Sequence, residues 1–228
     1  MKPWEILGRE QAPDGGELVL HHRDGEFVIR VDGRELMSSR SSHSEEEMAR
    51  LAIARLAGRD TPRVLIGGLG MGFTVRAALD ALPARAEVIV AELVPAVVAW
   101  NRGPLAPLAG RPLEDPRVRV ETIDVGRLMQ ETRVRFDAIL LDVDNGPQWI
   151  TSKSNQMLYS EVGLGTARRA LRPGGLLAVW SATDDPAFTR RLRKVGYETE
   201  TLQARARGPA GGARHIIFLG RVPALQPR

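Results

Sequence analysis

Residues 64–72 have the sequence Val-Leu-Ile-Gly-Gly-Leu-Gly-Met-Gly, a short apolar run that continues into a turn in which four of six residues are glycine. The apolar run predicts a buried strand, and the pattern from Phe73 to Ala81 predicts a helix. Glycines between a strand and a helix let the backbone pass close to a ligand at the helix N-terminus. The stretch therefore predicts a cofactor site formed by Gly67, Gly68, Gly70 and Gly72. A tight turn without a ligand is the alternative.

The rest of the chain repeats this alternation of strand and helix, which is typical of a Rossmann-like α/β fold with a mostly parallel sheet. Further strands are predicted at Val88–Ala91, Val118–Val120, Ala138–Leu141 and Leu176–Trp180. Further helices are predicted at Pro95–Arg102, Val125–Glu131, Gln156–Leu171 and Pro186–Lys194. Two last strands, Gly196–Leu202 and His215–Leu219, predict a C-terminal antiparallel hairpin. Such a hairpin favours a methyltransferase-like fold over a dinucleotide dehydrogenase.

The N-terminal part has a different pattern, in which polar and apolar residues alternate between Asp-Gly turns at 24–25 and 32–33. This pattern predicts a small β-meander over residues 1–42, followed by the Rossmann-like domain over 43–228. Ser44 and Glu47 have the spacing of a capping box, which predicts the start of the helix that links the two parts and ends near Gly58.

Composition excludes several classes of site and protein. With no cysteine and four scattered histidines, the sequence predicts neither a disulfide framework nor a metal site. No apolar run is long enough for a membrane helix, and the N-terminus lacks a signal-peptide core, so we expect a cytoplasmic protein without a membrane partner. The net charge of +4 is a modest excess carried by arginine, and the local arginine clusters, one of them at Arg205 and Arg207, suit solvated faces. Nucleic acid is therefore not favoured as a partner.

Acidic residues follow the predicted strands at the sheet edge where open α/β folds bind ligands. Glu92 comes twenty residues after Gly72, where a carboxylate can bind ribose hydroxyls, but it can equally support the next helix N-terminus. Asp124 can bind an adenine amino group or act as a helix N-cap. A nicotinamide cofactor is disfavoured because Phe73 stands where the third glycine of its fingerprint would be.

The stretch after the fourth strand carries the most reactive groups, in the order Asp142, Asp144, Asn145 and Trp149. Transfer of a carbon from a sulfonium to an amine needs a group that removes the proton from the amine, and a carboxylate can do so. Asp142 or Asp144 is therefore the candidate catalytic base. The alternative is an Asx-turn before Gly146. Trp149 and Tyr159 are candidates for contact with the substrate, although Tyr159 can also simply pack at a helix start.

These residues resemble the spermidine synthase family, a branch of the class I S-adenosylmethionine-dependent methyltransferase fold. The resemblance rests on four stretches, namely Val31–Gly33 with Arg40 and Glu47-Met48, the glycine turn with Glu92 and Asp124, Phe136–Asp142, and Leu171–Gly175. It implies that Glu92 binds ribose, that Asp124 contacts adenine, that Asp142 lies at both the cofactor and the reacting amine, and that the protein is a homodimer.

Four departures from the family pattern bear on the reaction. Gly70 replaces the Asp that binds the amine of decarboxylated S-adenosylmethionine, and an Asp there would repel the carboxylate of ordinary S-adenosylmethionine. Leu36 replaces a Gln beside the cofactor, and Glu45 replaces a Tyr of the substrate pocket. The catalytic motif is shortened to Asp142–Pro147, and with Asn145, Pro147 and Trp149 it loosely resembles the motif of amino-methyltransferases.

The sequence therefore favours a spermidine-synthase-like methyltransferase that uses S-adenosylmethionine and a small amine acceptor, with Asn145, Trp149, Tyr159 and Glu45 in the acceptor site. The first alternative is an aminopropyltransferase that uses decarboxylated S-adenosylmethionine and putrescine. The second is a cofactor-binding protein without catalytic activity.

Overall fold

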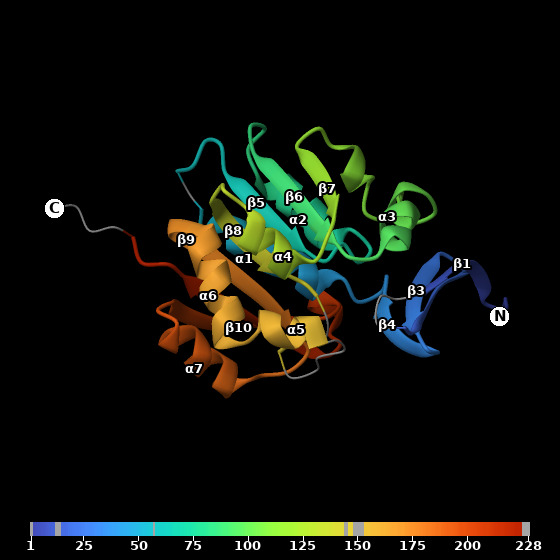
Figure 1. Ribbon diagram of the computed structural model, residues 1–228. Coiled ribbons are helices and arrows are strands. Elements are labelled where there is room, and N and C mark those ends of the chain that lie inside the picture. The colour runs from blue at the N-terminus through green and yellow to red at the C-terminus, as the bar shows by residue number, and fades with distance from the viewer. Residues whose placement is uncertain (1, 12–14, 57, 144–145, 148–152, 225–228) are drawn as a thin grey trace.

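The computed structural model describes residues 2–11, 15–56, 58–143, 146–147 and 153–224. Two sheets make up the fold (Figure 1). The smaller sheet has four antiparallel strands in the order β1 (Glu5–Gln11), β2 (Glu17–Arg23), β3 (Glu26–Val31) and β4 (Arg34–Ser38). Asp24, Gly25, Asp32 and Gly33 all have positive φ angles, as two-residue hairpin turns of this kind require. The predicted β-meander is thus confirmed.

The larger sheet has seven strands in the order β10-β11-β9-β8-β5-β6-β7. The five adjacent strands from β9 to β7 run parallel, and β11 pairs antiparallel with both β9 and β10. Their bounds are β5 (Arg63–Gly67), β6 (Glu87–Glu92), β7 (Val118–Thr122), β8 (Phe136–Leu141), β9 (Leu171–Ser181), β10 (Glu198–Arg205) and β11 (Arg214–Arg221). The chain extends from β5 to one side through β6 and returns to β8 on the other side, which makes the β5/β8 boundary the topological switch point where such folds bind ligands.

Helices cover both faces of this sheet. One face packs against α1 (His43–Ala54), α2 (Phe73–Ala81) and α3 (Pro95–Arg102). The other packs against α4 (Val125–Glu131), α6 (Glu161–Ala170) and α7 (Pro186–Lys194), with the short α5 (Lys153–Leu158) before α6. Alternate strand residues point to opposite faces, so Ile66 of β5 joins the first cluster and its neighbour Leu65 joins the second. The Rossmann-like fold is confirmed.

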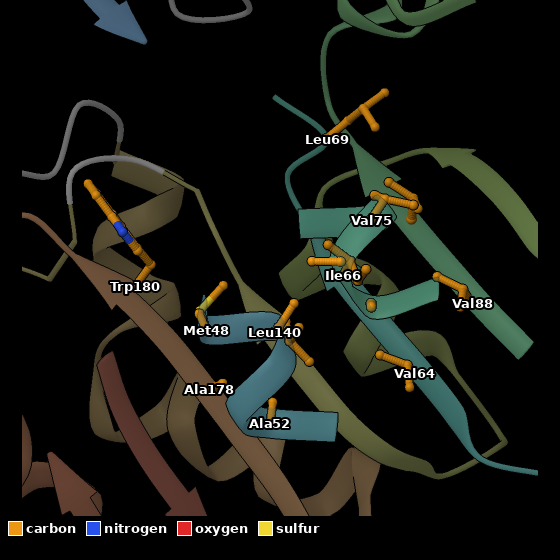
Figure 2. Packing of buried hydrophobic residues seen from close by; sticks show 14 of the residues in the cluster. Met48, Ala52, Val64, Ile66, Leu69, Val75, Val88, Leu140, Ala178 and Trp180 are labelled. Carbon is orange, nitrogen blue, oxygen red and sulfur yellow. The ribbon is translucent and has the colours of Figure 1, made fainter. Parts of the chain in front are cut away.

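The first of these clusters also connects the small sheet to the large one. Leu20 and Ile29 of the small sheet are fully buried in the same cluster as Met48 and Ala52 of α1. Figure 2 shows Met48 and Ala52 beside Leu140 of β8 and Ala178 of β9. The shared core fixes the small sheet and the start of α1 against the carboxyl edge of the large sheet.

Two predictions about helix ends are wrong. The helix after the meander has Ser42 as its N-cap residue, and the Ser42 hydroxyl bonds to Glu46 at 2.9 Å, so Ser44 lies inside the first turn and is no cap. The helix predicted at Gln156–Leu171 is interrupted, because the Ser160 side chain accepts a hydrogen bond from Gly163 N at 3.2 Å and starts α6 as a separate helix.

Candidate active site

The glycine turn lies at the switch point, directly against the end of β8. Gly67 O accepts a hydrogen bond from Asp142 N at 2.9 Å, and Gly68 N donates to Ala91 O at 2.9 Å. Gly68 has a φ angle of +87°, and a Cβ atom at this position would lie 2.3 Å from the backbone oxygen of Asp142. Only glycine fits, because the turn passes too close to Asp142 for a side chain.

The far end of the turn faces the small sheet. A Cβ atom at Gly70 would have Met37 Sδ of β4 as its nearest neighbour, at 3.6 Å, so there is room for a side chain here. The Asn101 side-chain amide of α3 donates to Gly70 O at 2.8 Å and holds this part of the turn in place. Gly72, at a φ angle of +86°, is the N-cap residue of α2. The turn thus presents backbone at a helix N-terminus, with Met37 opposite Gly70.

Glu92 ties the turn to the end of β6. Its side chain is only 8% exposed and accepts hydrogen bonds from Leu69 N at 2.9 Å and from Val94 N at 2.8 Å. Burial raises the pKa of Glu92, although these backbone hydrogen bonds act in the opposite direction. Each carboxylate oxygen has a second lone pair, so the residue can still accept from a ribose hydroxyl. That role remains a prediction.

Asp124 begins α4, as one of its two predicted roles requires. Its Oδ1 atom accepts a hydrogen bond from Arg127 N at 2.8 Å, which makes it the N-cap residue. Its Oδ2 atom makes no hydrogen bond to any residue that the structure describes. That oxygen is available to an adenine amino group, and this contact stays a prediction.

Asp142, at the end of β8, and Glu45, in the first turn of α1, are two acids whose charges act on each other. The Thr74 hydroxyl of α2 donates to Asp142 Oδ2 at 2.6 Å. Burial raises the pKa of Asp142 to about 6, against the lowering effect of that hydrogen bond. Burial raises the pKa of Glu45 well above its usual value, and the charges of Asp142 and Glu46 raise it further. Two adjacent acids that resist ionising together form a site suited to a cation.

The other predicted site residues fall into two groups. Asp144, Asn145 and Trp149 lie outside the described residues. Tyr159 is 1% exposed and packs edge-on against Phe188 of α7, with 5.9 Å between the ring centroids. It therefore belongs to the core on the α6/α7 face, and a role in substrate contact stays a prediction.

A pocket of about 440 Å³ opens beside Glu45. It lies between β4, the start of α1, the end of β9 and the turn between β10 and β11. Its lining comprises Glu26, Glu35, Leu36, Met37, Ser38, Arg40, Ser41, Glu45, Trp180, Ala182, Ala206, Arg207, Gly212, Ala213 and His215. Met37 lines this pocket and is also the side chain nearest to an added Cβ atom at Gly70, so one side chain of β4 borders both the pocket and the glycine turn.

Sequence reasoning missed the residues that β9 and the C-terminal hairpin contribute to this pocket. Trp180 lies next to the last residue of β9, at the carboxyl edge beside β8, so its position in the predicted sheet was a usable signal. Arg207 and His215 had no such signal, because a hairpin turn can fold over either side of the edge. Arg207 was interpreted as part of a solvated arginine cluster.

The acid pair gives a prediction about stability. The raised pKa of Glu45 means that the folded protein holds a proton that the unfolded chain releases above pH 4.5, so Glu45 reduces stability progressively as the pH rises. We expect Glu45→Gln to raise the Tm at pH 8 and to change it little at pH 4. The increase should be about 2–4 °C per kcal/mol of repulsion removed.

Glu47→Gln is the matched control, because Glu47 lies in the same helix and, among the described residues, pairs with Arg50 alone, at 3.4 Å. Thermal unfolding of both variants across pH 4–8 measures the difference. Equal changes in Tm for the two variants would contradict the proposed repulsion between Glu45 and Asp142. So would a stabilisation by Glu45→Gln that becomes smaller as the pH rises.

No family model matches the chain, but several curated proteins have similar sequences. A polyamine aminopropyltransferase of Mycobacterium tuberculosis is 28% identical over 191 residues, which cover 79% of this chain and 35% of the relative. Polyamine aminopropyltransferase 1 of Streptomyces coelicolor is 31% identical over 150 residues, 61% of this chain and 27% of the relative. The chain thus spans about a third of the length of these curated relatives.

Several solved structures with a similar fold are spermidine synthases or a probable spermidine synthase. The enzyme from Thermotoga maritima has a TM-score of 0.73 at 19% identity and covers 95% of this chain and 72% of its own. A probable spermidine synthase from Corynebacterium glutamicum has a TM-score of 0.63 at 20% identity, with coverage of 97% and 81%. The predicted likeness to the spermidine synthase family is confirmed. In the described part of the chain, no helix combines the length and apolar character needed to span a membrane.

Proposed function

We propose that this spermidine-synthase-like chain is a transferase that moves a carbon group from an S-adenosyl sulfonium to an amine. The observation that carries the proposal is the position of Asp142. Its backbone is fixed against Gly67 and Gly68 of the glycine turn, and its charge acts on the carboxyl group of Glu45 and raises the pKa of that group. A donor on the turn and an amine on the acid pair would meet at this point.

The residues present suit an adenosyl donor. The turn offers backbone without side chains where Gly68 leaves no space for a Cβ atom, and Glu92 and Asp124 keep acceptor capacity for ribose and adenine. Such a donor supplies a carbon bound to a positively charged sulfur, which is readily displaced. The contribution of the chain is to hold donor and acceptor in line and to exclude water.

The acid pair accounts for the acceptor side of the reaction. An amine enters as an ammonium ion and is held by Asp142 and Glu45, whose mutual repulsion it relieves. Asp142, with a pKa of about 6, is ionised at neutral pH and is a stronger base there than an ordinary aspartate. It takes the proton from the ammonium, and the amine nitrogen then forms its bond to carbon. The carbon–sulfur bond breaks, and sulfur leaves with the electron pair as a neutral thioether.

We favour the aminopropyl group as the group transferred, because the curated relatives are named polyamine aminopropyltransferases. This reverses the order of the two transferase hypotheses drawn from the sequence. The thioether product distinguishes them. Aminopropyl transfer leaves 5′-methylthioadenosine, whereas methyl transfer leaves S-adenosylhomocysteine. Mass spectrometry after incubation with putrescine and each donor in turn tests the proposal, and S-adenosylhomocysteine as the only thioether would contradict it.

Methyl transfer remains the second candidate because of Gly70. The space at Gly70 faces the thioether of Met37, so the turn carries no carboxylate at this point for the amine of a decarboxylated donor. We expect Gly70→Asp to increase the affinity for decarboxylated S-adenosylmethionine over S-adenosylmethionine by about tenfold, the size of one charge-assisted hydrogen bond.

Gly70→Asn is the matched control, because Asn adopts the left-handed backbone at a φ angle of +53° as readily as Asp but carries no charge. Isothermal titration calorimetry with both donors gives the ratio of affinities. If Asp and Asn change that ratio equally, charge at position 70 does not select the donor.

A further inference from the structure

The pocket beside Glu45 is lined by charged groups of both signs. Glu45 lies on the first turn of α1, and the charge of Asp142 acts on it. Arg207 and His215 flank the turn between β10 and β11, which packs against the start of α1 through the hydrogen bond from His43 N to Ala206 O at 3.1 Å. An acid and a base in one pocket prefer different chemical groups, and a ligand that carries the same group twice would not satisfy both.

Arg207 is a cation of the lining that no acid among the described residues neutralises. Arg40, the other arginine of the lining, pairs with Glu26 at 3.0 Å. Arg207 is exposed and forms no ion pair within the part of the chain that the structure describes. Its guanidinium group is available to a ligand, and the geometry of that group suits a carboxylate.

His215 adds a neutral hydrogen-bond donor. The fully buried Ser44 hydroxyl accepts a hydrogen bond from Trp180 Nε1 at 3.0 Å and lies 2.8 Å from His215 Nδ1. Among the described residues, Nδ1 is the only acceptor offered to the Ser44 hydroxyl proton. We assign Nδ1 as the acceptor because the Ser44 hydroxyl proton then has a partner, and this assignment places the imidazole proton on Nε2.

That Nε2–H group is free to bind a ligand. It makes no hydrogen bond to a described residue, and it is not fully buried. Because His215 lines the pocket, a ligand there can reach this group. Burial also lowers the pKa of His215, which keeps the ring neutral. A neutral N–H group donates to an oxygen atom and cannot accept from an ammonium ion.

We propose that this pocket binds a ligand that carries both an amine and a carboxylate, with the ammonium at Glu45 and the carboxylate at Arg207 and His215. The inference rests on the proposed transferase function and adds the chemistry of the ligand. Met37 borders both the pocket and the glycine turn, so two ligands would bring these groups to this place. One is an amino-acid acceptor. The other is the amino-acid tail of S-adenosylmethionine, which would replace the decarboxylated donor favoured above. The chemistry that the pocket recognises is the same in both cases.

Two pairs of probes, each differing by one carboxylate, test this proposal. L-Ornithine is compared with 1,4-diaminobutane in the presence of 5′-methylthioadenosine, and S-adenosylmethionine is compared with decarboxylated S-adenosylmethionine. Calorimetry gives the ratio of dissociation constants within each pair. We expect the carboxylated member of one pair to bind at least about tenfold more tightly. The pair that shows this preference identifies the source of the carboxylate.

Three substitutions assign the preference to residues. Arg207→Gln should reduce the preference about tenfold, and His215→Gln should reduce it by less. Arg214→Gln is the matched control, because Arg214 is exposed on the same hairpin and does not line the pocket. Glu35→Gln tests the opposite possibility, since Glu35, exposed on β4, is the acid that would hold a second ammonium ion.

The proposal is overturned if the decarboxylated member binds more tightly in both pairs and Glu35→Gln removes that preference. It is also overturned if Arg207→Gln and Arg214→Gln behave alike. Failure of the transferase function gives a different result, namely that neither adenosyl donor binds to the wild-type chain at millimolar concentration.

Discussion

Replacing Asp142 by Asn is expected to reduce the rate of group transfer by about 10²–10⁴-fold, the usual contribution of a positioned general base. The Asn side chain keeps the size of Asp142 and can still accept the hydrogen bond that Thr74 donates at 2.6 Å. The backbone hydrogen bond from Asp142 N to Gly67 O does not involve the side chain at all. The variant should therefore fold normally and bind the donor, and the loss should appear in kcat.

Thr74→Val tests the same base through its pKa. The Thr74 hydroxyl lowers the pKa of Asp142, which burial raises to about 6, so removing the hydroxyl should raise that pKa further. The ionised form is the active base, so the rate should fall on the acid side and the rising limb of the pH–rate profile should move to higher pH. Because Glu45 titrates with Asp142, the measured values belong to the pair.

Thr166→Val is the control for this substitution. Thr166 is 5% exposed, and its hydroxyl bonds within its own helix, to Val162 O at 3.1 Å. Steady-state rates from pH 5 to pH 9 compare the three variants with the wild type. If Asp142→Asn retains more than a tenth of the wild-type kcat, Asp142 is not the base, and Asp144 becomes the residue to replace.

The elements whose hydrophobic pattern is continuous were predictable from the sequence. Helices α2, α3, α4 and α7 have the predicted bounds, because each is followed by a turn residue or a new strand. The buried strands were recognised because parallel strands covered on both faces have almost unbroken apolar runs, as in β8. The edge that carries Asp142 follows from those strands, which is why this candidate site residue could be identified.

Features that depend on contacts between distant segments were not predictable. Ser44 has the spacing of a helix cap, but it bonds to Trp180 and His215, which are 136 and 171 residues away. The break before α6 depends on one serine side chain competing for the backbone. The pocket has the same origin, because the turn that carries Arg207 is placed by tertiary packing and not by local sequence.

The glycine turn was predicted from local sequence, but its close approach to Asp142 depends on packing between distant segments. Gly68 tests the role of that approach most directly. We expect Gly68→Ala to abolish donor binding within the range of calorimetry. At a φ angle of +87° an alanine costs about 1–2 kcal/mol in backbone strain alone. The added Cβ would also lie 2.3 Å from Asp142 O, a contact that real structures do not contain. Either the turn or the end of β8 must move, and both carry groups of the proposed site.

Gly58→Ala separates the strain from the clash. Gly58 has a φ angle of +85°, almost equal to that of Gly68, and no atom lies within 4 Å of its added Cβ. Both variants should therefore lose a similar amount of stability from strain, but only Gly68→Ala should lose donor binding. Unfolding in urea measures the first effect and calorimetry the second. The donor does not bind on this turn if its affinity falls equally in both variants, or if Gly68→Ala still binds it. The contact between position 68 and Asp142 O lies in the middle of the turn, so a donor bound there would be affected.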